Sequence, residues 1–328
     1  MGIIQNKKKI NKALRGIKTV FIMAHKDLDL DALGSSIGTY LLLKKKRKDC
    51  YIIIDDTTHE LGVEKVLREL EGCFKIIKSD TVEKYKNKIN SKNLLVILDT
   101  SKETLVQNKE LLKEFNQKLV LDHHDLGRNT IEDATIINDT EVSSTCEMIT
   151  QLIELYDVEI ESYYATVLLA GIVLDTNNFT LKTTPETYYS AYYLASLGAS
   201  AKKVQYLLKQ DINDYTQRQK LLSCIETING RIAITKATQH TVYRREELAK
   251  VADTLLFFNN IEASFVIGKI GKDTIGISAR SLGNYEINKI LEKIGGGGST
   301  HNGAAKFEKT TISKVEQLLK NTIKEMGE

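Results

Sequence analysis

The chain has 328 residues and a formal net charge of +3, from 46 basic and 43 acidic residues. This near balance argues against a surface that coats long nucleic acid, and the length favours two domains over a single small core. The longest nearly apolar run, Tyr163–Leu174, is shorter than the ~20 residues of a membrane-spanning helix. The basic N-terminus lacks the apolar segment of a signal peptide, and the cysteines have no metal-type spacing. We therefore expect a cytoplasmic protein with no membrane partner.

The first half alternates short apolar runs with helical stretches. Residues 19–24, 50–54, 94–98 and 118–121 predict buried strands, and residues 31–46 and 60–70 predict helices. Such alternation is typical of a parallel α/β sheet, in which ligands bind beyond the carboxyl ends of the strands. Residues 142–172 predict mostly helix, the run "AGIVLDT" at 170–176 predicts a further strand, and a helix follows from Pro185 to a stop at Gly198.

Residues 201–228 predict a charged helical connector, and the sequence after them has the apolar runs and alternation of strands. Strands are predicted at 231–237, 263–270 and 274–281, and helices at 286–294 and 312–326, with a glycine-rich stretch at 295–305. We therefore expect an α/β domain over residues 1–200, the connector over 201–228, and a smaller α/β domain over 229–328.

Acidic and imidazole side chains follow the predicted strands of the first half. They are His25, Asp29, Asp31, Asp99, Asp122, His123, His124 and Asp175. Taken singly, each has an ordinary explanation: Asp31 could cap a helix, and Asp99 could belong to a turn. Taken together, they would crowd one sheet edge with carboxylates that repel one another unless a cation joins them. The pattern therefore predicts a metal site.

The number of carboxylates indicates how many cations this site holds. Asp29, Asp31, Asp99 and Asp175 supply four negative charges, which two divalent cations would cancel. Oxygen ligands with imidazole suit Mn²⁺, with Mg²⁺ or Co²⁺ as alternatives, and two such ions can clamp an attack on phosphorus. One histidine of the adjacent pair can then face the metals while the other faces a substrate phosphate, and Asp122 is placed to orient an imidazole.

Four segments, "HKDLDLDALGS", "LDTS", "LDHHDLG" and "GIVLDT", resemble the four motifs of the DHH phosphoesterase superfamily. Leu28 stands where the first motif usually has proline. The resemblance implies that Asp99 bridges two metals and that His124 lies beside the scissile phosphate, which makes these two the catalytic residues. It also implies two ligand sets: His25, Asp29 and Asp99 for one metal, and Asp31, Asp99, His123 and Asp175 for the other.

The second half resembles the DHH-associated C-terminal domain, whose glycine-rich loop binds substrate. Residues 1–200 would then be the catalytic domain and 229–328 the substrate-binding domain. The loop would comprise Gly295, Gly296, Gly297 and Gly298 with Ser299 and His301, although "GGGGS" alone could be a flexible linker. The family usually has histidine directly after the glycines, where this chain has Ser299. Arg280 is the expected phosphate or base contact, against the alternative of an ordinary exposed arginine.

Further segments resemble the catalytic region of GdpP-type cyclic-di-AMP phosphodiesterases: "EVSSTCEM", "GIVLDTNNFTLKT", "ADTLL", "EASFVIGKIGKDTIGISARSLG" and "GGGG". This implies a two-metal phosphodiesterase that opens cyclic di-AMP to linear pApA and could act onward to AMP. The alternative is a nanoRNase or pAp-phosphatase-like hydrolase of short linear oligonucleotides. A non-catalytic nucleotide sensor would require a lost metal ligand, and a pyrophosphatase would lack the glycine loop. The expected partners are such small nucleotides and, for assembly, a second copy in a homodimer.

Overall fold

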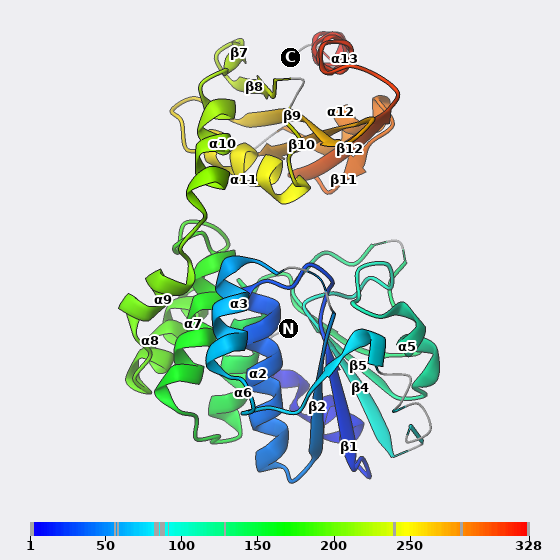
Figure 1. Ribbon diagram of the computed structural model, residues 1–328, viewed down its shortest axis with the longest axis vertical. Helices are drawn as coiled ribbons and strands as arrows, with labels where there is room; N and C mark the ends of the chain where they lie inside the picture. Colours follow the sequence, from blue (N-terminus) through cyan, green and yellow to red (C-terminus); the bar gives the residue numbers. More distant parts are fainter. Residues whose placement is uncertain are drawn as a thin grey trace. The chain divides into compact units, whose positions relative to one another are not determined.

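The computed structural model describes residues 3–55, 57, 59–81, 85, 89–90, 92–127, 129–238, 241–282 and 285–326 (Figure 1). The chain forms two compact units, Met1–Lys209 and Gln210–Glu328. The first contains a six-stranded parallel sheet and the second a six-stranded mixed sheet, so the predicted α/β class is confirmed. Residues 201–228 are divided between the two units. Among the described residues, no helix is long and apolar enough to cross a membrane.

The first unit contains six strands and eight α-helices that the structure describes. Its strands are β1 (Thr19–Met23), β2 (Asp49–Ile54), β3 (Ile76–Lys78), β4 (Asn93–Leu98), β5 (Lys118–Asp122) and β6 (Thr135–Asn138). Its α-helices are α1 (Lys7–Ala13), α2 (Leu30–Lys45), α3 (Leu61–Glu69), α5 (Lys109–Glu114), α6 (Thr145–Leu155), α7 (Ser162–Asp175), α8 (Pro185–Ser196) and α9 (Ala201–Leu207). Short 3₁₀ helices lie at Ile3–Asn6 and Ser79–Thr81.

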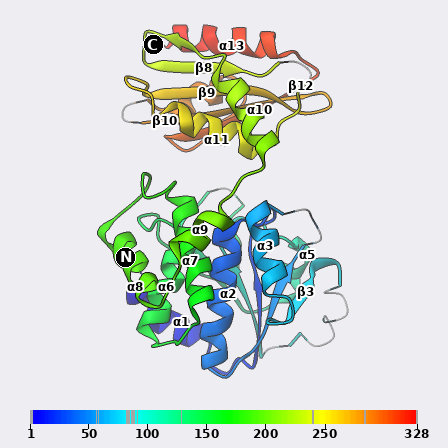
Figure 2. The ribbon, with the colours of Figure 1, turned by 60° about the vertical axis from the view of Figure 1, so that its left-hand side comes forward.

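The strand order of the first sheet is β3-β2-β1-β4-β5-β6. Side chains alternate along β1, so that Val20 and Ile22 join one hydrophobic core while Phe21 and Met23 join another on the opposite face. Helices α2, α6 and α7 lie on one side of the sheet and α5 lies on the other (Figures 1 and 2). Both faces are therefore covered, which is why the strands read as continuous apolar runs.

The strand predicted at 170–176 is wrong, because these residues complete helix α7 and its C-cap. Side chains from Ala165 to Val173 are buried all around the helix. A helix enclosed on every side shows no polar face, so its 3.6-residue period is invisible in the sequence. Asp175 therefore reaches the sheet edge from the end of a helix and not from the end of a strand.

The second unit carries a mixed sheet in the order β11-β12-β10-β9-β8-β7. Only the β8–β9 pair is parallel among these described pairings. Its strands are β7 (Glu226–Ile228), β8 (Ile232–Lys236), β9 (Ala263–Gly271), β10 (Thr274–Ser281), β11 (Gly297–Gly298) and β12 (Asn302–Glu308). Its helices are α10 (Ile212–Leu222), α11 (Arg245–Leu255), α12 (Ile287–Lys293) and α13 (Ile312–Glu325).

Helices α2, α6 and α7 approach closely where α7 has a glycine. A Cβ atom added at Gly171 would lie 2.5 Å from Cys146 Sγ and 3.0 Å from the Cα of Asp31. The second of these is a backbone atom, so the helices themselves would have to move. Gly171 therefore fixes how near α7 comes to the start of α2.

We predict that Gly171→Ala lowers the free energy of unfolding. Overpacking costs about 1–3 kcal/mol, which outweighs the ~1 kcal/mol that alanine gains over glycine inside a helix. Urea unfolding should show a lower midpoint. Gly127→Ala is the control, because its added Cβ would meet only Lys102 Cε, at 3.7 Å. Equal stability of the two variants would contradict the tight crossing.

Candidate metal centre

The predicted ligands gather at the carboxyl edge of the first sheet, where the strand order reverses. β1 lies between β2 and β4 in the sheet, and chain connections leave these central strands in opposite directions. His25 follows β1, Asp99 follows β4 and His123 follows β5. In open parallel sheets this reversal point leaves a crevice in which ligands bind.

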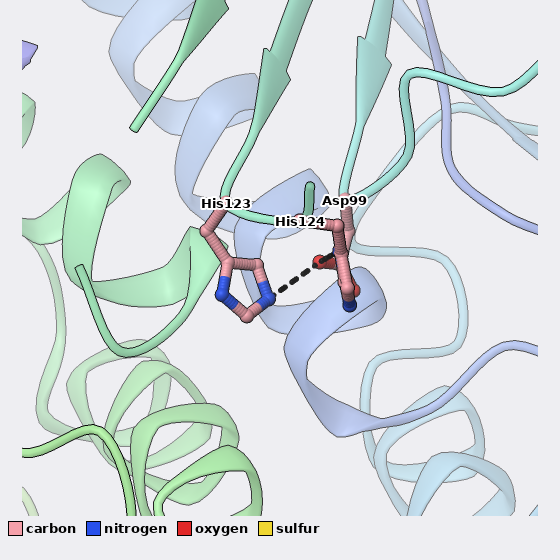
Figure 3. Close-up of side chains that lie close together, drawn as sticks. All are labelled: Asp99, His123 and His124. Carbon is pink, nitrogen blue, oxygen red and sulfur yellow. Dashed lines mark ion pairs between the residues drawn. The ribbon is translucent and has the colours of Figure 1, made fainter. Parts of the chain in front are cut away.

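Asp99 lies at the middle of the cluster. Its Oδ2 is 3.3 Å from His25 Nε2. Its Oδ1 is 3.3 Å from His123 Nε2, as Figure 3 shows. The residue is buried and has a φ of +60°, a left-handed conformation that is uncommon outside glycine. Its backbone N–H donates to Leu121 O at 3.0 Å, and the Thr145 hydroxyl donates to Oδ1 at 3.0 Å. The two carboxylate oxygens therefore face two different imidazoles.

The opening of helix α2 contributes two aspartates with different local roles. Asp29, and not Asp31, is the N-cap: its Oδ1 accepts from Ala32 N–H at 2.9 Å. Asp31 is fully buried in the first turn and accepts from the backbone N–H groups of Thr145 and Cys146, at 2.8 and 2.7 Å. The amino end of α6 thus holds the Asp31 carboxylate in place.

His123 and His124 differ in burial, although their ring centroids are only 4.2 Å apart and both rings approach Asp99 Oδ1. The His123 ring is buried, with Nε2 3.1 Å from Asp175 Oδ2 in addition to its Asp99 contact. The side chain of His124 is 49% exposed, and its Nδ1 lies 2.9 Å from Asp122 Oδ1. Asn138 Nδ2 donates to His124 O at 2.8 Å, which fixes the backbone there. One imidazole therefore faces inward and the other faces solvent.

Three sets of these side chains place ligand atoms within 4.8 Å of one another, and such a spacing can hold a metal ion. The sets are His25, Asp29 and Asp99; Asp31, His123 and Asp175; and Asp99, His123 and His124. The first reproduces one predicted ligand set, and the second contains three members of the other. All six predicted ligands therefore converge at one edge of the first sheet.

The charges of the cluster perturb one another strongly. Burial raises the pKa of Asp31 well above its ordinary value, and the nearby carboxylates of Asp99 and Asp175 raise it further. Burial also raises the pKa of Asp175, against the opposing effect of His123. Burial would raise the pKa of Asp99 as well, but the facing imidazoles of His123 and His25 hold it well below its ordinary value.

The pKa values of the two buried imidazoles are raised, whereas burial alone would lower them. Burial lowers the pKa of His25 and of His123, yet the facing carboxylates raise both pKa values well above 6.5. Without a metal, protons on these rings therefore supply positive charge between the carboxylates.

The contacts of His123 fit a metal better than they fit a hydrogen-bonded core histidine. Neither of its ring nitrogens makes a hydrogen bond to any residue that the structure describes, although both are buried. Its Nε2 lies close to two carboxylates without hydrogen-bond geometry. A cation shared by this nitrogen and the carboxylate oxygens would satisfy all of them, and O/N ligands of this kind suit Mn²⁺, Mg²⁺ or Co²⁺.

The segment "EVSSTCEM" contributes to the family resemblance, but sequence reasoning did not connect it to the metal-ligand cluster, which it supports. Ser144 caps α6 by accepting from Glu147 N–H at 3.1 Å, and this cap sets the helix end that binds Asp31 and Asp99. The cap signature, a serine followed three residues later by glutamate, was present in the sequence. Its partners on α2 and β4 are distant in the chain, so no local signal could reveal them.

The residues predicted to bind substrate lie in the second unit. Gly297 and Gly298 form β11, which pairs with β12, so this stretch is an ordered hairpin and not a flexible linker. A Cβ at Gly298 would lie 2.1 Å from Asn302 O, so the hairpin requires glycine there. Gly295 and Gly296 precede the hairpin, and Ser299 N–H donates to Asn302 O at 2.8 Å within its turn.

Arg280 and His301 lie beside this hairpin on the same sheet. Arg280 on β10 is opposite Asn302, and its Nε donates to Asp253 Oδ1 at 2.7 Å. His301 Nδ1 is 3.2 Å from Ser281 Oγ, and His301 O accepts from Ser281 N–H. The predicted group therefore shares one end of the second sheet, and Arg280 has a carboxylate partner instead of being freely solvated.

Comparison with known proteins gives two family matches that together span most of the chain. Residues 19–172 match the DHH family, N-terminal domain, and residues 229–328 match the DHHA1 domain. A solved exopolyphosphatase-related protein from Bacteroides fragilis, 22% identical, superposes with a TM-score of 0.78 over 99% of this chain and 98% of that one. This last likeness concerns the fold alone.

Two curated relatives are informative. The cyclic-di-AMP phosphodiesterase GdpP of Geobacillus thermodenitrificans is 36% identical over 93% of this chain and 47% of that protein. The bifunctional oligoribonuclease and PAP phosphatase NrnA of Thermus thermophilus is 26% identical over 96% of this chain and 91% of that protein. The chain spans about half the length of the cyclic-di-AMP phosphodiesterases it matches. The chain therefore carries a DHH-family N-terminal domain followed by a DHHA1 domain.

Proposed function

We propose that this chain is a metal-dependent phosphodiesterase that hydrolyses cyclic di-AMP to linear pApA, with onward hydrolysis to AMP. The observation that carries the proposal is the position of Asp99, whose two carboxylate oxygens face His25 and His123 separately. A carboxylate placed in this way can join two cations. The 36% identity to proteins named cyclic-di-AMP phosphodiesterases supports the choice of substrate.

We assign the ligands to two divalent ions, with Mn²⁺ as the first choice. His25, Asp29 and Asp99 would hold one ion, and Asp31, Asp99, His123 and Asp175 the other. When bound, such ions lower the pKa of water and stabilise charge on phosphorus. The four carboxylates balance the charge of two divalent ions, and the hydrogen bonds from α6 hold Asp31 ready in its buried position.

His124 is the proposed phosphate-facing residue. Its Nδ1 is occupied by Asp122, which leaves the other ring nitrogen of a half-exposed imidazole for a phosphate oxygen. Asp122 thereby fixes the ring orientation, a role carboxylates often have beside working imidazoles. His124 would stabilise charge on the scissile phosphate or transfer a proton to the leaving oxygen.

The second unit is proposed to contribute substrate contacts through Arg280 and the glycine hairpin of residues 295–301. A guanidinium and closely approaching backbone N–H groups suit phosphate oxygens. Ser299 and His301 lie in the turn of this hairpin, where they would contact the same group. Arg280→Ala should therefore raise KM more than it lowers kcat.

The test is hydrolysis of cyclic di-AMP, pApA and pAp by the purified Mn²⁺ protein, with products resolved over time. The proposal expects cyclic di-AMP to disappear with pApA as the first product. If cyclic di-AMP stays intact while pApA or short oligonucleotides yield mononucleotides, the alternative hydrolase of short linear oligonucleotides takes its place. The NrnA relative, matched over most of its own length, favours keeping this alternative in the test.

We predict that Asp99→Asn lowers turnover by ~10³-fold or more, on the scale of removing a group that stabilises transition-state charge. The fold should survive, because asparagine tolerates a left-handed backbone. Asp157→Asn is a matched control: its φ is +50° and its side chain is 103% exposed. Near wild-type turnover by Asp99→Asn in Mn²⁺ would contradict the bridging role.

We predict that alanine substitutions of His123 and His124 have different effects, one on metal binding and the other on the rate of hydrolysis. His123→Ala should reduce the metal retained after dialysis, because it removes a buried ligand. His124→Ala should retain metal but slow hydrolysis by ~10²-fold or more. Elemental analysis and steady-state kinetics on both variants make the comparison. Equal metal loss from the two would show that the roles are assigned wrongly.

Metal should stabilise the chain more at higher pH. His25 and His123 have raised pKa values in the folded chain, so protonation of their rings stabilises the metal-free fold. This stabilisation is fully present below about pH 6.5 and is lost as the pH rises through the raised pKa values. Asp31, whose pKa is also raised, penalises the metal-free fold once ionised. Asp99 changes nothing in this window, since its lowered pKa keeps it ionised throughout.

Thermal melting with and without Mn²⁺ measures this effect. The rise in Tm on adding Mn²⁺ should depend on its concentration and be larger at about pH 8 than at about pH 6, because the metal must displace protons from the imidazoles. A rise that is the same at both pH values, or no rise at all, would contradict the proposed exchange of protons for metal.

A further inference from the structure

The segment that joins α7 to α8, residues 176–184, has an unusual backbone. Asn177, Asn178, Phe179 and Lys182 all have positive φ values, of 44°, 58°, 62° and 45°. For asparagine this is mildly unfavourable, but for a phenylalanine it is a genuine outlier that surrounding contacts must impose. Thr176 imposes it here, because its hydroxyl oxygen accepts from Phe179 N–H at 3.0 Å while donating to Ile172 O.

The result of this backbone is a stacked aromatic pair. The ring of Phe179 lies 5.6 Å from the ring of Tyr188 on α8, with 18° between their planes. Tyr188 is 57% exposed, whereas Phe179 is partly buried and packs against the core of the first unit. The two rings form one wall of an open pocket of about 480 Å³, to which Thr140, Glu141, Lys182 and Thr183 also contribute.

Both walls of this pocket begin at the candidate metal centre. On one side, Phe179 is four residues beyond Asp175 along the chain. On the other side, Thr140 follows Asn138, whose side chain donates to His124 O, and Asp139, whose N–H donates to Asp122 O at 3.1 Å. The two segments that line the pocket therefore continue directly from residues that belong to the candidate metal centre or contact it.

A buried carboxylate binds the residue next to Tyr188 and so fixes the position of the aromatic pair. Glu147 on α6 accepts hydrogen bonds from the hydroxyls of Thr187, at 2.8 Å, and Ser143, at 2.5 Å. Thr187 directly precedes Tyr188, and Thr184 and Thr187 form the capping box of α8. The wall is thus tied to the same helix end that positions Asp31 and Asp99.

We propose that the pocket face of the Phe179–Tyr188 pair binds a nucleobase of the substrate by stacking, with Lys182 placed for the phosphate attached to it. An aromatic wall beside threonine hydroxyls, one lysine and one glutamate matches the flat, partly polar surface of a base. This proposal rests on the proposed nucleotide chemistry, and it adds the residues that would make the enzyme prefer nucleotides over simple phosphodiesters.

A binding measurement tests the pocket without hydrolysis. The fluorescence of 2-aminopurine riboside 5′-monophosphate should be quenched on binding to the Mn²⁺ protein, because stacking on an aromatic ring quenches this base. Phe179→Ala and Tyr188→Ala should weaken binding by roughly 5- to 150-fold, and Phe179→Trp should restore it. Tyr192→Ala is the matched control, a 68%-exposed tyrosine on the same helix that does not line the pocket. It should bind like the wild type.

A kinetic comparison then separates stacking from a general loss of structure. The substrates are pApA and an analogue in which one base is replaced by hydrogen. Phe179→Ala and Tyr188→Ala should lower kcat/KM for pApA but leave that for the abasic analogue unchanged, with equal metal content. A loss of the same factor on both substrates, or quenching that is as strong in Tyr188→Ala as in the wild type, would overturn the proposal. Quenching without any hydrolysis of dinucleotides would instead refute the proposed function and leave the base-binding pocket standing.

Discussion

The buried carboxylate of Asp99 is the constraint on which the first unit depends. A charge is placed out of water on a residue with a left-handed backbone, and both features are unfavourable in themselves. They persist because the β4–β5 pairing fixes the backbone, Thr145 donates to the carboxylate, and two imidazoles face it. Such an arrangement is stable only while positive charge lies between these groups, supplied by protons in the free chain and by metal in the proposed enzyme.

A single helix end connects the parts of the site. The first turn of α6 donates backbone N–H groups to Asp31 and a hydroxyl to Asp99, and its Glu147 carboxylate accepts a hydrogen bond from Thr187 in the first turn of α8. The metal-facing residues and the aromatic wall therefore share one support, so a change at Glu147 should disturb both. The groups expected to contact substrate in the second unit, Arg280 and the glycine hairpin, rest on a separate sheet with its own core.

Much of this arrangement could be predicted from the sequence, because the physics involved is local. The buried strands are continuous apolar runs, and each is followed at once by its acidic or imidazole residue. The errors arise where an interaction is remote in the chain. Helix α7 resembles a strand because neighbours bury every side of it, and Asp31 was a candidate cap although its true partners, in α6, lie more than a hundred residues away. The stacking of Phe179 on Tyr188 likewise depends on a left-handed backbone, which the hydrophobic periodicity of a sequence does not reveal.

The most direct test of the two-metal centre is electron paramagnetic resonance of the protein titrated with Mn²⁺. Two ions joined by the Asp99 carboxylate should be magnetically coupled, so the filled site should give the spectrum of an exchange-coupled pair, and Asp99→Asn should lose it. Only the hyperfine pattern of isolated ions, at every Mn²⁺ concentration in the wild-type protein, would contradict the bridging carboxylate.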